Sequence, residues 1–409
     1  MLNKRVVITG LGVISPLGNT VEEYWHGLIE GKSGIGPITL FDSSKYYVKV
    51  AAEVKGFDAT RYMAAKRADR NSRCTHFAIA ATRMALESAR LNITPENAET
   101  VGVTIATSGA TSILPYYAET LSSRPMRIDP LLANKIAPSM VPAQVGLEFG
   151  AKGPNLSLNS ACSSGNDAIG TGMSRICFGD AEVMIAGGSE AQVSEVSFAC
   201  MSVVGALSRT ADPQKACRPF DLNRNGMVFG EGAGILILES LEHALKRNAP
   251  ILAEIAAAGW SFDAFNDTAP DPVQQAVAMR KAIDKAGLSP EDIDYINAHG
   301  TSTYLNDKSE TAAIKTVFGE QAYQIPISST KSMTGHLLGA AGALEAAICV
   351  KVIQEGIIPP TINQEYPDPE CDLDYVPNTS RHTKVNTLMS NSFGFGGHNA
   401  VIILSRFSD

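Results

Sequence analysis

The sequence predicts an α/β fold in which buried strands alternate with helices. Two observations support it: apolar runs of strand length alternate with helical patterns along the whole chain, and no linker-like segment interrupts the alternation. A chain of 409 residues is too long for one hydrophobic core, so we expect two lobes or two similar halves fused into one unit. The apolar character of the runs favours parallel strands that are covered on both faces.

The first half of the chain, which we place at residues 1–249, opens with a strand over residues 5–10. Thr20 and Glu23 form a capping-box pattern that begins a helix ending near Gly31. The further elements expected in this half are helices over 72–91 and 162–178 and strands over 101–106, 183–186 and 234–238.

The second half, residues 250–409, follows a similar order of elements, although no residue-level repeat is visible. The expected elements are strands over 251–258, 293–297 and 325–329, helices over 272–286, 307–318 and 335–356, and a hairpin over 387–405 with a glycine turn at 394–397. In open α/β sheets the chemistry gathers in loops beyond the carboxyl ends of the strands, so we look for candidate residues there.

The composition excludes several classes of protein. Lys and Arg number 34 against 42 Asp and Glu, and this net charge of −8 argues against a general affinity for nucleic acid or anionic membrane. No apolar run approaches the roughly 18 residues that a membrane span requires. The seven cysteines are odd in number, form no C-x-x-C pair and are not preceded by a signal-peptide pattern, so we expect a cytoplasmic protein.

Familiar catalytic motifs are incomplete or absent. Gly10 and Gly12 begin a dinucleotide-binding pattern, but Ser15 replaces its third glycine. The segment 31–33 resembles the end of a P-loop, yet His26 stands where the first glycine belongs. No G-x-S-x-G or H-E-x-x-H motif is present, which removes support for a serine hydrolase or a zinc protease.

Cys162 is the strongest candidate for a nucleophile. It lies among small residues in the segment 159–166, where a strand or turn passes into a helix. We expect the free N–H groups and the positive dipole at the helix N-terminus to lower the pKa of its thiol. The alternative is a buried structural thiol, which we favour for Cys177, Cys200 and Cys349.

Two histidines each follow an apolar strand, at the place where active-site loops belong. They are His299 and His336, and both lie beside hydroxyl or lysine side chains. If Lys331 is buried it needs an acidic partner, which Glu345 on the following helix could supply. The glycine turn of the last hairpin offers backbone N–H groups for an oxyanion hole, although a plain turn would look the same.

Together these residues resemble the β-ketoacyl-[acyl-carrier-protein] synthases, the type II condensing enzymes of the thiolase-like superfamily. The resemblance covers essentially the whole chain. It rests on residues 6–13, 161–162, 218–221, 230–234, 297–303, 329–336 and the C-terminal glycine turn. It implies a five-layered αβαβα fold built from two similar halves, in a homodimer or in a heterodimer with a chain-length-factor-like subunit.

The resemblance also implies roles for the candidate residues. Cys162 would accept the acyl group, and His299 and His336 would stabilise the enolate formed when malonyl-carrier protein loses CO₂. The backbone N–H groups of Cys162 and Phe395 would form the oxyanion hole, with Phe395 as a gate. Lys331, paired with Glu345, would orient His336. We expect no intrinsic cofactor and no metal, because the substrates are carried on phosphopantetheine.

The expected partner is an acidic acyl carrier protein. Hydroxyl groups matching positions that bind its pantetheine arm are those of Thr301, Thr303 and, more weakly, Thr268. Residues 61–73 form the clearest basic cluster of the chain, which indicates a docking surface, although a solvated helix face is the alternative. The docking residues that we select are Lys66, Arg67, Arg70 and Arg127.

Several positions depart from the fatty-acid pattern near the acyl pocket, including the small, polar segment 106–112 and Met201. Fatty-acid chain elongation is our leading interpretation, and the catalytic ketosynthase subunit of a polyketide or polyene system is the alternative. A non-catalytic chain-length subunit would lack Cys162, and a thiolase would carry a cysteine near His398. A structural cation could be bound by the polar side chains of Asn297, Glu345 and Ser392, and the sequence does not decide whether one is present.

Overall fold

The computed structural model describes residues 4–408 and has a ten-stranded sheet as its centre. The strands of this sheet are β1 (Val6–Ile14), β4 (Val101–Ala106), β5 (Asn155–Leu158), β6 (Val183–Glu190), β7 (Gly232–Ser240), β8 (Ala253–Phe262), β9 (Tyr295–Asn297), β10 (Ile327–Ser328), β13 (Thr387–Gly394) and β14 (His398–Ser405). Two small sheets pair β2 (Gly36–Pro37) with β3 (Val50–Ala51) and β11 (Ile357–Ile358) with β12 (Arg381–His382).

The helices cover the sheet and connect its strands. They are α1 (Val21–Ile29), α2 (Ala65–Ala68), α3 (Arg73–Ser88), α4 (Leu114–Ser123), α5 (Leu132–Ile136), α6 (Met140–Phe149), α7 (Ser164–Phe178), α8 (Glu195–Val204), α9 (Leu241–Lys246), α10 (Pro272–Ala286), α11 (Tyr304–Phe318), α12 (Lys331–Thr334) and α13 (Ala341–Glu355). Among the described residues, none of these helices is both long enough and apolar enough to cross a bilayer.

The sheet consists of two five-strand units with the same strand order. From the edge inward, one unit has the order β5-β4-β6-β7-β1 and the other has the order β10-β9-β13-β14-β8. If the five strands of each unit are counted in chain order, both units have the spatial order third, second, fourth, fifth, first. The units meet where β1 pairs with β8. The division of the chain between residues 249 and 250 stays a prediction.

The pairing directions correct the expectation of parallel strands. Neighbours pair in parallel at β10–β9, β9–β13, β4–β6 and β4–β5. The other five pairs of the central sheet, including β1–β7 and β13–β14, are antiparallel. A strand that is buried on both faces reads as an apolar run whichever direction its neighbours take, so the sequence pattern does not distinguish the two cases.

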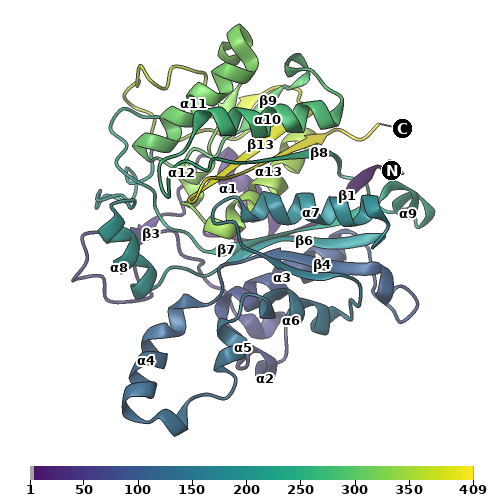
Figure 1. Ribbon diagram of the computed structural model, residues 1–409, viewed down its shortest axis with the longest axis vertical. Coiled ribbons are helices and arrows are strands. Elements are labelled where there is room, and N and C mark those ends of the chain that lie inside the picture. The colour runs from purple at the N-terminus through teal and green to yellow at the C-terminus, as the bar shows by residue number, and fades with distance from the viewer. Residues whose placement is uncertain (1–3, 409) are drawn as a thin grey trace.

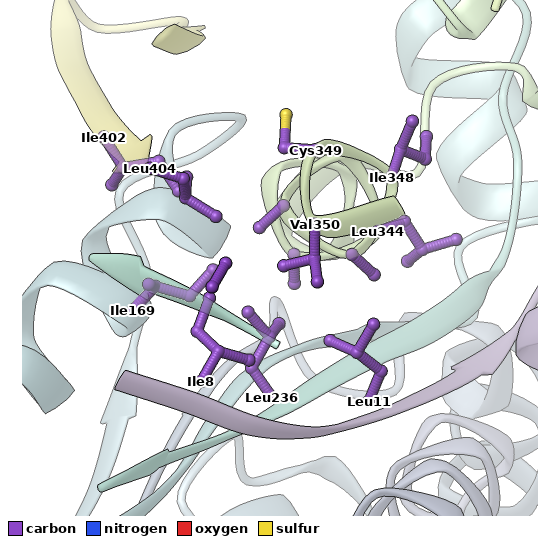
Figure 2. Packing of buried hydrophobic residues seen from close by; sticks show 14 of the residues in the cluster. Ile8, Leu11, Ile169, Leu236, Leu344, Ile348, Cys349, Val350, Ile402 and Leu404 are labelled. Carbon is purple, nitrogen blue, oxygen red and sulfur yellow. The ribbon is translucent and has the colours of Figure 1, made fainter. Parts of the chain in front are cut away.

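Helices and the two sheet units form five layers (Figure 1). α7 and α13 lie between the units and contact strands of both, α3 covers the outer face of β1 and β7, and α10 covers the outer face of β8 and β14. Figure 2 shows Val350 on the side of α13 that faces Ile8 and Leu236, Leu344 on the side nearer Leu11, and Ile402 of the other unit beside the helix. The α/β fold from two similar halves is therefore present.

Two predicted helices begin later than expected, and both differences concern the candidate site. The helix expected from residue 162 begins at Ser164, and the one expected from residue 335 begins at Ala341. Gly335 has φ +66° and Leu338 has φ +49°, left-handed values that a continuing α-helix does not contain. Cys162 and His336 therefore lie in turns before their helices.

Residues 114–136, which we call the arm, were not assigned to any element from the sequence. The arm contains α4 and α5 and projects from the body of the molecule (Figure 1). α4 has no buried residue, and Tyr116, Leu121 and Met126 are exposed on the arm. α4 therefore does not pack against the body through a buried face.

Candidate active site

A single pocket brings together the candidate residues from both halves of the chain. Its wall includes Cys162 from the first half and His299, His336 and Phe395 from the second. The pocket opens among the loops that follow the strands, where we looked for chemistry. Residues more than 230 positions apart in the sequence thus share one cavity, which no local pattern could establish.

Cys162 lies on a sharp turn between β5 and α7. The preceding residue, Ala161, has φ +53°, a left-handed value that is costly for a residue with a Cβ. The Ser164 hydroxyl donates to the Ala161 carbonyl and accepts the Ser160 N–H at 2.8 Å, and so holds the turn. A Cβ on Gly394 would lie 3.1 Å from the Cys162 nitrogen, so the close approach of this second loop requires glycine.

The environment of Cys162 corrects the expectation of a lowered thiol pKa. Burial raises the pKa of the Cys162 thiol to about 11, although the backbone N–H of Phe395 and the charge of Lys331 lower it in part. The side chain is only 6% exposed, and the loss of hydration outweighs the helix N-terminus. At neutral pH the resting group is therefore a thiol, which must lose its proton as it reacts.

The two histidines face Cys162 as neutral rings. The Cys162 sulfur and a ring nitrogen from each of His299 and His336 all lie within 4.8 Å of one another. Burial, reinforced by the charge of Lys331, holds the pKa of both imidazoles well below its ordinary value. Because neutral imidazole has one N–H and one acceptor nitrogen, the tautomer of each ring decides what it can do.

The backbone fixes the tautomer of His336. The Leu338 N–H donates to His336 Nδ1 at 3.2 Å, so Nδ1 is the acceptor and Nε2 carries the proton. Among the described residues Nε2 has no hydrogen-bond partner, and neither does Nδ1 of His299. Buried polar atoms are nearly always paired, and both rings line the pocket, so these two nitrogens are candidates for pairing with a substrate.

Buried charged groups support each histidine loop. Lys331 Nζ pairs with Glu345 Oε1, the pair expected from the sequence. Burial raises the pKa of Glu345, and Lys331 opposes that effect. Sequence reasoning missed Glu310 on α11, whose carboxylate accepts the N–H groups of His299 and Gly300 at 2.8 Å each. An acidic residue inside a buried helix pattern was the signal that could have found it.

The glycine turn between β13 and β14 places a backbone donor at the nucleophile. The Phe395 N–H points at the Cys162 sulfur. Gly396 and Gly397 have φ +83° and +88°, which only glycine adopts readily, so the turn can present this N–H to the pocket. The Phe395 ring packs against the apolar cluster that contains Phe198 and Phe229.

Comparison with known proteins identifies the family. The model of the β-ketoacyl synthase N-terminal domain matches residues 3–244, and that of the β-ketoacyl synthase C-terminal domain matches residues 252–365. The chain belongs to the β-ketoacyl synthase family. It is 47% identical to 3-oxoacyl-[acyl-carrier-protein] synthase 2 of Synechocystis sp., covering 99% of this chain and 98% of that protein. The corresponding protein of Coxiella burnetii is 46% identical, with 100% of both chains covered.

Solved structures show that the fold is thiolase-like. The ishigamide ketosynthase/chain length factor matches with a TM-score of 0.93 and 40% identity, covering 99% of this chain and 100% of that chain. A type II PKS ketosynthase, solved with its acyl-carrier protein, matches with a TM-score of 0.90 and 35% identity over the same shares. The chain is thus a β-ketoacyl-ACP synthase, a C–C bond-forming acyltransferase, and its more identical curated relatives favour fatty-acid chain elongation over the polyketide alternative.

The three threonines selected for pantetheine binding line the same pocket. The Thr301 and Thr303 hydroxyls lie 2.8 Å apart, and Thr303 also caps α11. Thr268 lies in the loop after β8, where its N–H donates to Asn266 Oδ1 at 2.9 Å. Their role in the β-ketoacyl synthase reaction stays a prediction.

The four residues selected for docking fall into two groups. Lys66, Arg70 and Arg127 are exposed. Arg67 is partly buried, pairs with Glu148 at 2.9 Å and donates to the Gln144 carbonyl at 3.1 Å. Arg67 is therefore held against α6, and its availability to a carrier protein is lower than the sequence suggests.

Two groups of side chains in this β-ketoacyl synthase have the chemistry of metal ligands. A thiol and two imidazoles at the spacing of Cys162 and the histidines suit a soft metal ion. Asn297 Oδ1, Glu345 Oε2 and Ser392 Oγ are buried and have no partner among the described residues, and such oxygens suit a hard cation. The expectation that the reaction needs no metal stays a prediction.

Proposed function

We propose that this pocket performs decarboxylative condensation with Cys162 as the nucleophile and His299 and His336 as the groups that act on the malonyl unit. The observation that carries the proposal is the convergence of the Cys162 sulfur and the two ring nitrogens within 4.8 Å in one buried pocket. A nucleophile and two neutral imidazoles in contact with one cavity can serve both half-reactions.

In the first half-reaction Cys162 takes the acyl group from a carrier-protein thioester. The sulfur attacks the thioester carbonyl carbon, an S–C bond forms, and the pantetheine S–C bond breaks. Because burial raises the pKa of the Cys162 thiol to about 11, a base must take its proton. His299 is the acceptor we favour, since the proton of His336 is already on Nε2, and the departing pantetheine thiolate then receives the proton.

In the second half-reaction malonyl-carrier protein enters the same pocket. The thioester carbonyl accepts hydrogen bonds from His336 Nε2–H and from His299, which stabilise the enolate formed as CO₂ leaves. The carbanion carbon attacks the acyl carbon on Cys162, and the S–C bond breaks to return the thiolate, which takes a proton from water to become the resting thiol. The N–H groups of Cys162 and Phe395 hold the oxyanion of the tetrahedral intermediate.

The substrates reach the pocket on the phosphopantetheine of an acyl carrier protein, with no cofactor of the enzyme's own. Support comes from Thr301, Thr303 and Thr268 along the pocket wall, and from the solved relative in complex with an acyl-carrier protein. Lys66, Arg70 and Arg127 would receive the acidic carrier. The seven cysteines are free, which supports a reducing, cytoplasmic setting.

The active form we propose is a homodimer. β5 is an edge strand of the central sheet, and one side of it is unpaired among the described residues. The arm reaches the body through α5, which contacts α6, and α6 contacts β5. It exposes Tyr116, Leu121 and Met126, and Met126 is 96% exposed. A second copy that pairs along β5 would cover both features by two-fold symmetry. A heterodimer with a chain-length-factor-like subunit is the alternative.

The test incubates the purified chain with acyl-carrier and malonyl-carrier proteins and follows acyl load by intact mass and product by chromatography. The chain alone should acylate at Cys162 and release β-ketoacyl product. Turnover only after addition of a second, cysteine-lacking subunit would replace the homodimer with the polyketide-type heterodimer. A chain that never acylates would contradict the role of Cys162.

A further inference from the structure

The two sheet units have equivalent loops and strand ends on the side of the pocket, and one strand there ends in a buried carboxylate that the proposed reaction does not use. In the second unit the loops after its second, third and fourth strands carry His299, Lys331 with His336, and Phe395. In the first unit the corresponding loops carry Ser108 and Cys162, and Glu190 ends the fourth strand. Glu190 is fully buried.

Donors from three different segments converge on the Glu190 carboxylate. Its Oε1 accepts the Ser108 N–H at 2.7 Å and the Ser108 hydroxyl at 2.8 Å. Its Oε2 accepts from Gln192 Nε2 at 3.2 Å, and the Gly339 N–H donates to the same carboxylate. These hydrogen bonds oppose the effect of burial, which still raises the pKa of Glu190 to about 7, so the carboxylate carries its full charge only above neutral pH.

The contact with Gly339 leads directly to His336. Gly339 follows Leu338, the residue whose N–H donates to His336 Nδ1. Leu338 has φ +49°, an unfavourable conformation that surrounding contacts must maintain. A Cβ on Gly339 would lie 2.8 Å from Glu190 Oε1, so the carboxylate and this turn are packed closely together.

We propose that Glu190 is a positioning residue for condensation, holding the 338–339 turn so that Leu338 keeps His336 in the tautomer with Nε2–H facing the substrate. This inference rests on the proposed role of His336. If the turn shifted, Nδ1 would lose its donor and the proton could move to Nδ1, which leaves Nε2 without a proton for the malonyl carbonyl. The Glu190 carboxylate also accepts hydrogen bonds from Ser108, so residues of the first unit hold His336 of the second unit in place.

Two variants test the inference from opposite ends of the contact. Glu190→Gln removes the charge and one acceptor, whereas Gly339→Ala keeps the charge and displaces the carboxylate. Glu53→Gln is the matched control, because Glu53 is also buried and accepts backbone N–H groups, from Thr39 and Leu40. For each protein, CO₂ release from malonyl-carrier protein, acylation of Cys162 and thermal unfolding are measured.

Both test variants should release CO₂ about ten- to a hundredfold more slowly, the usual cost of losing a partner that orients a reacting group, while acylation changes less than about threefold. Glu53→Gln should change neither rate. If Glu190→Gln unfolds, Gly339→Ala alone decides. Equal loss of both rates, or unchanged CO₂ release, would overturn the inference.

A pH profile of Cys162 alkylation reads the charge of Glu190 separately from its contact with the 338–339 turn. The charge of Glu190 raises the pKa of the Cys162 thiol, and Lys331 lowers it, while the two facing histidines are neutral. Glu190→Gln should therefore shift alkylation of Cys162 to lower pH, and Gly339→Ala, which keeps the charge, should shift it less. An equal shift in both variants, or no shift in Glu190→Gln, would contradict the ionised carboxylate. Should His336→Ala itself release CO₂ normally, the proposed function fails instead.

Discussion

The two five-strand units share a strand order yet contribute different chemistry to the pocket. The first supplies a thiol on the turn after β5, and the second supplies two imidazoles after β9 and β10 together with the glycine turn after β13. The scaffold fixes where loops converge, and the residues on those loops decide the reaction. The difference between the halves lies in the loops and not in the sheets.

The halves also differ in how burial acts on their reactive groups. Burial raises the pKa of the Cys162 thiol to about 11 and lowers the pKa of both histidines. Desolvation disfavours the charged form in each case, so an acid and two bases lie side by side uncharged at neutral pH. The pocket is thus prepared for proton transfer that accompanies bond formation.

The largest effect is expected when the nucleophile, which the first half supplies, is removed. Cys162→Ala should lower acyl transfer by at least about a thousandfold, since nothing else in the pocket supplies an S–C bond. Intact mass after incubation with acyl-carrier protein gives the result. Thermal unfolding should stay close to that of the unmodified chain, and acyl load on the alanine variant would move the nucleophile to another residue.

The next effect concerns the second half. His336→Ala should lower CO₂ release from malonyl-carrier protein by about a hundred- to a thousandfold, the cost of losing one donor to an oxyanion. Acylation should persist. Trapped CO₂ from labelled malonyl-carrier protein is the measurement, and His299→Ala provides the comparison, with loss of CO₂ release and slower acylation because His299 also takes the thiol proton.

The pH dependence of Cys162 alkylation shows which of two opposite effects on the thiol pKa is larger, the lowering by the helix N-terminus or the raising by burial. Below its pKa the thiolate fraction rises about tenfold per pH unit, so with a pKa near 11 the rate should keep rising between pH 7 and 9. Iodoacetamide labelling followed by peptide mass analysis measures this. A plateau near pH 7 or 8 would mean that the helix N-terminus outweighs burial.

The smallest effect is expected at the docking surface of the first half. Lys66→Glu with Arg70→Glu should weaken carrier-protein binding several-fold at low salt and less at high salt, because both side chains are exposed. A binding titration at two salt concentrations measures the change. The matched control is Lys246→Glu with Lys384→Glu, two exposed lysines elsewhere. If both pairs of substitutions weaken binding equally, the carrier protein does not dock at Lys66 and Arg70.

The sequence predicted elements best where local signals mark both ends. Residues 272–286 form α10 as expected, because Asp271 caps the helix, Pro272 begins it and Gly287 takes φ +66° just beyond its end. β5 was missed because its residues are partly exposed and show no apolar run. α8 was missed because its apolar residues do not follow one face.

The site was predicted where motifs are local and missed where they are not. Cys162, His299 and His336 each stand in a characteristic segment, and the structure brings them into one pocket. Glu190 accepts from Ser108, 82 residues away in the sequence, so only the fold reveals that contact. Glu310 lies 11 residues after His299, and its only signal was an acidic residue inside a buried helix pattern. The thiol pKa was misjudged because the helix N-terminus is visible in the sequence and the depth of burial is not.

The most direct test measures acylation and CO₂ release side by side in Cys162→Ala and His336→Ala. We predict a reciprocal result: the first variant still releases CO₂ from malonyl-carrier protein without acylating, and the second acylates without releasing CO₂. If each variant loses both activities while remaining folded, the two halves do not divide the chemistry as proposed.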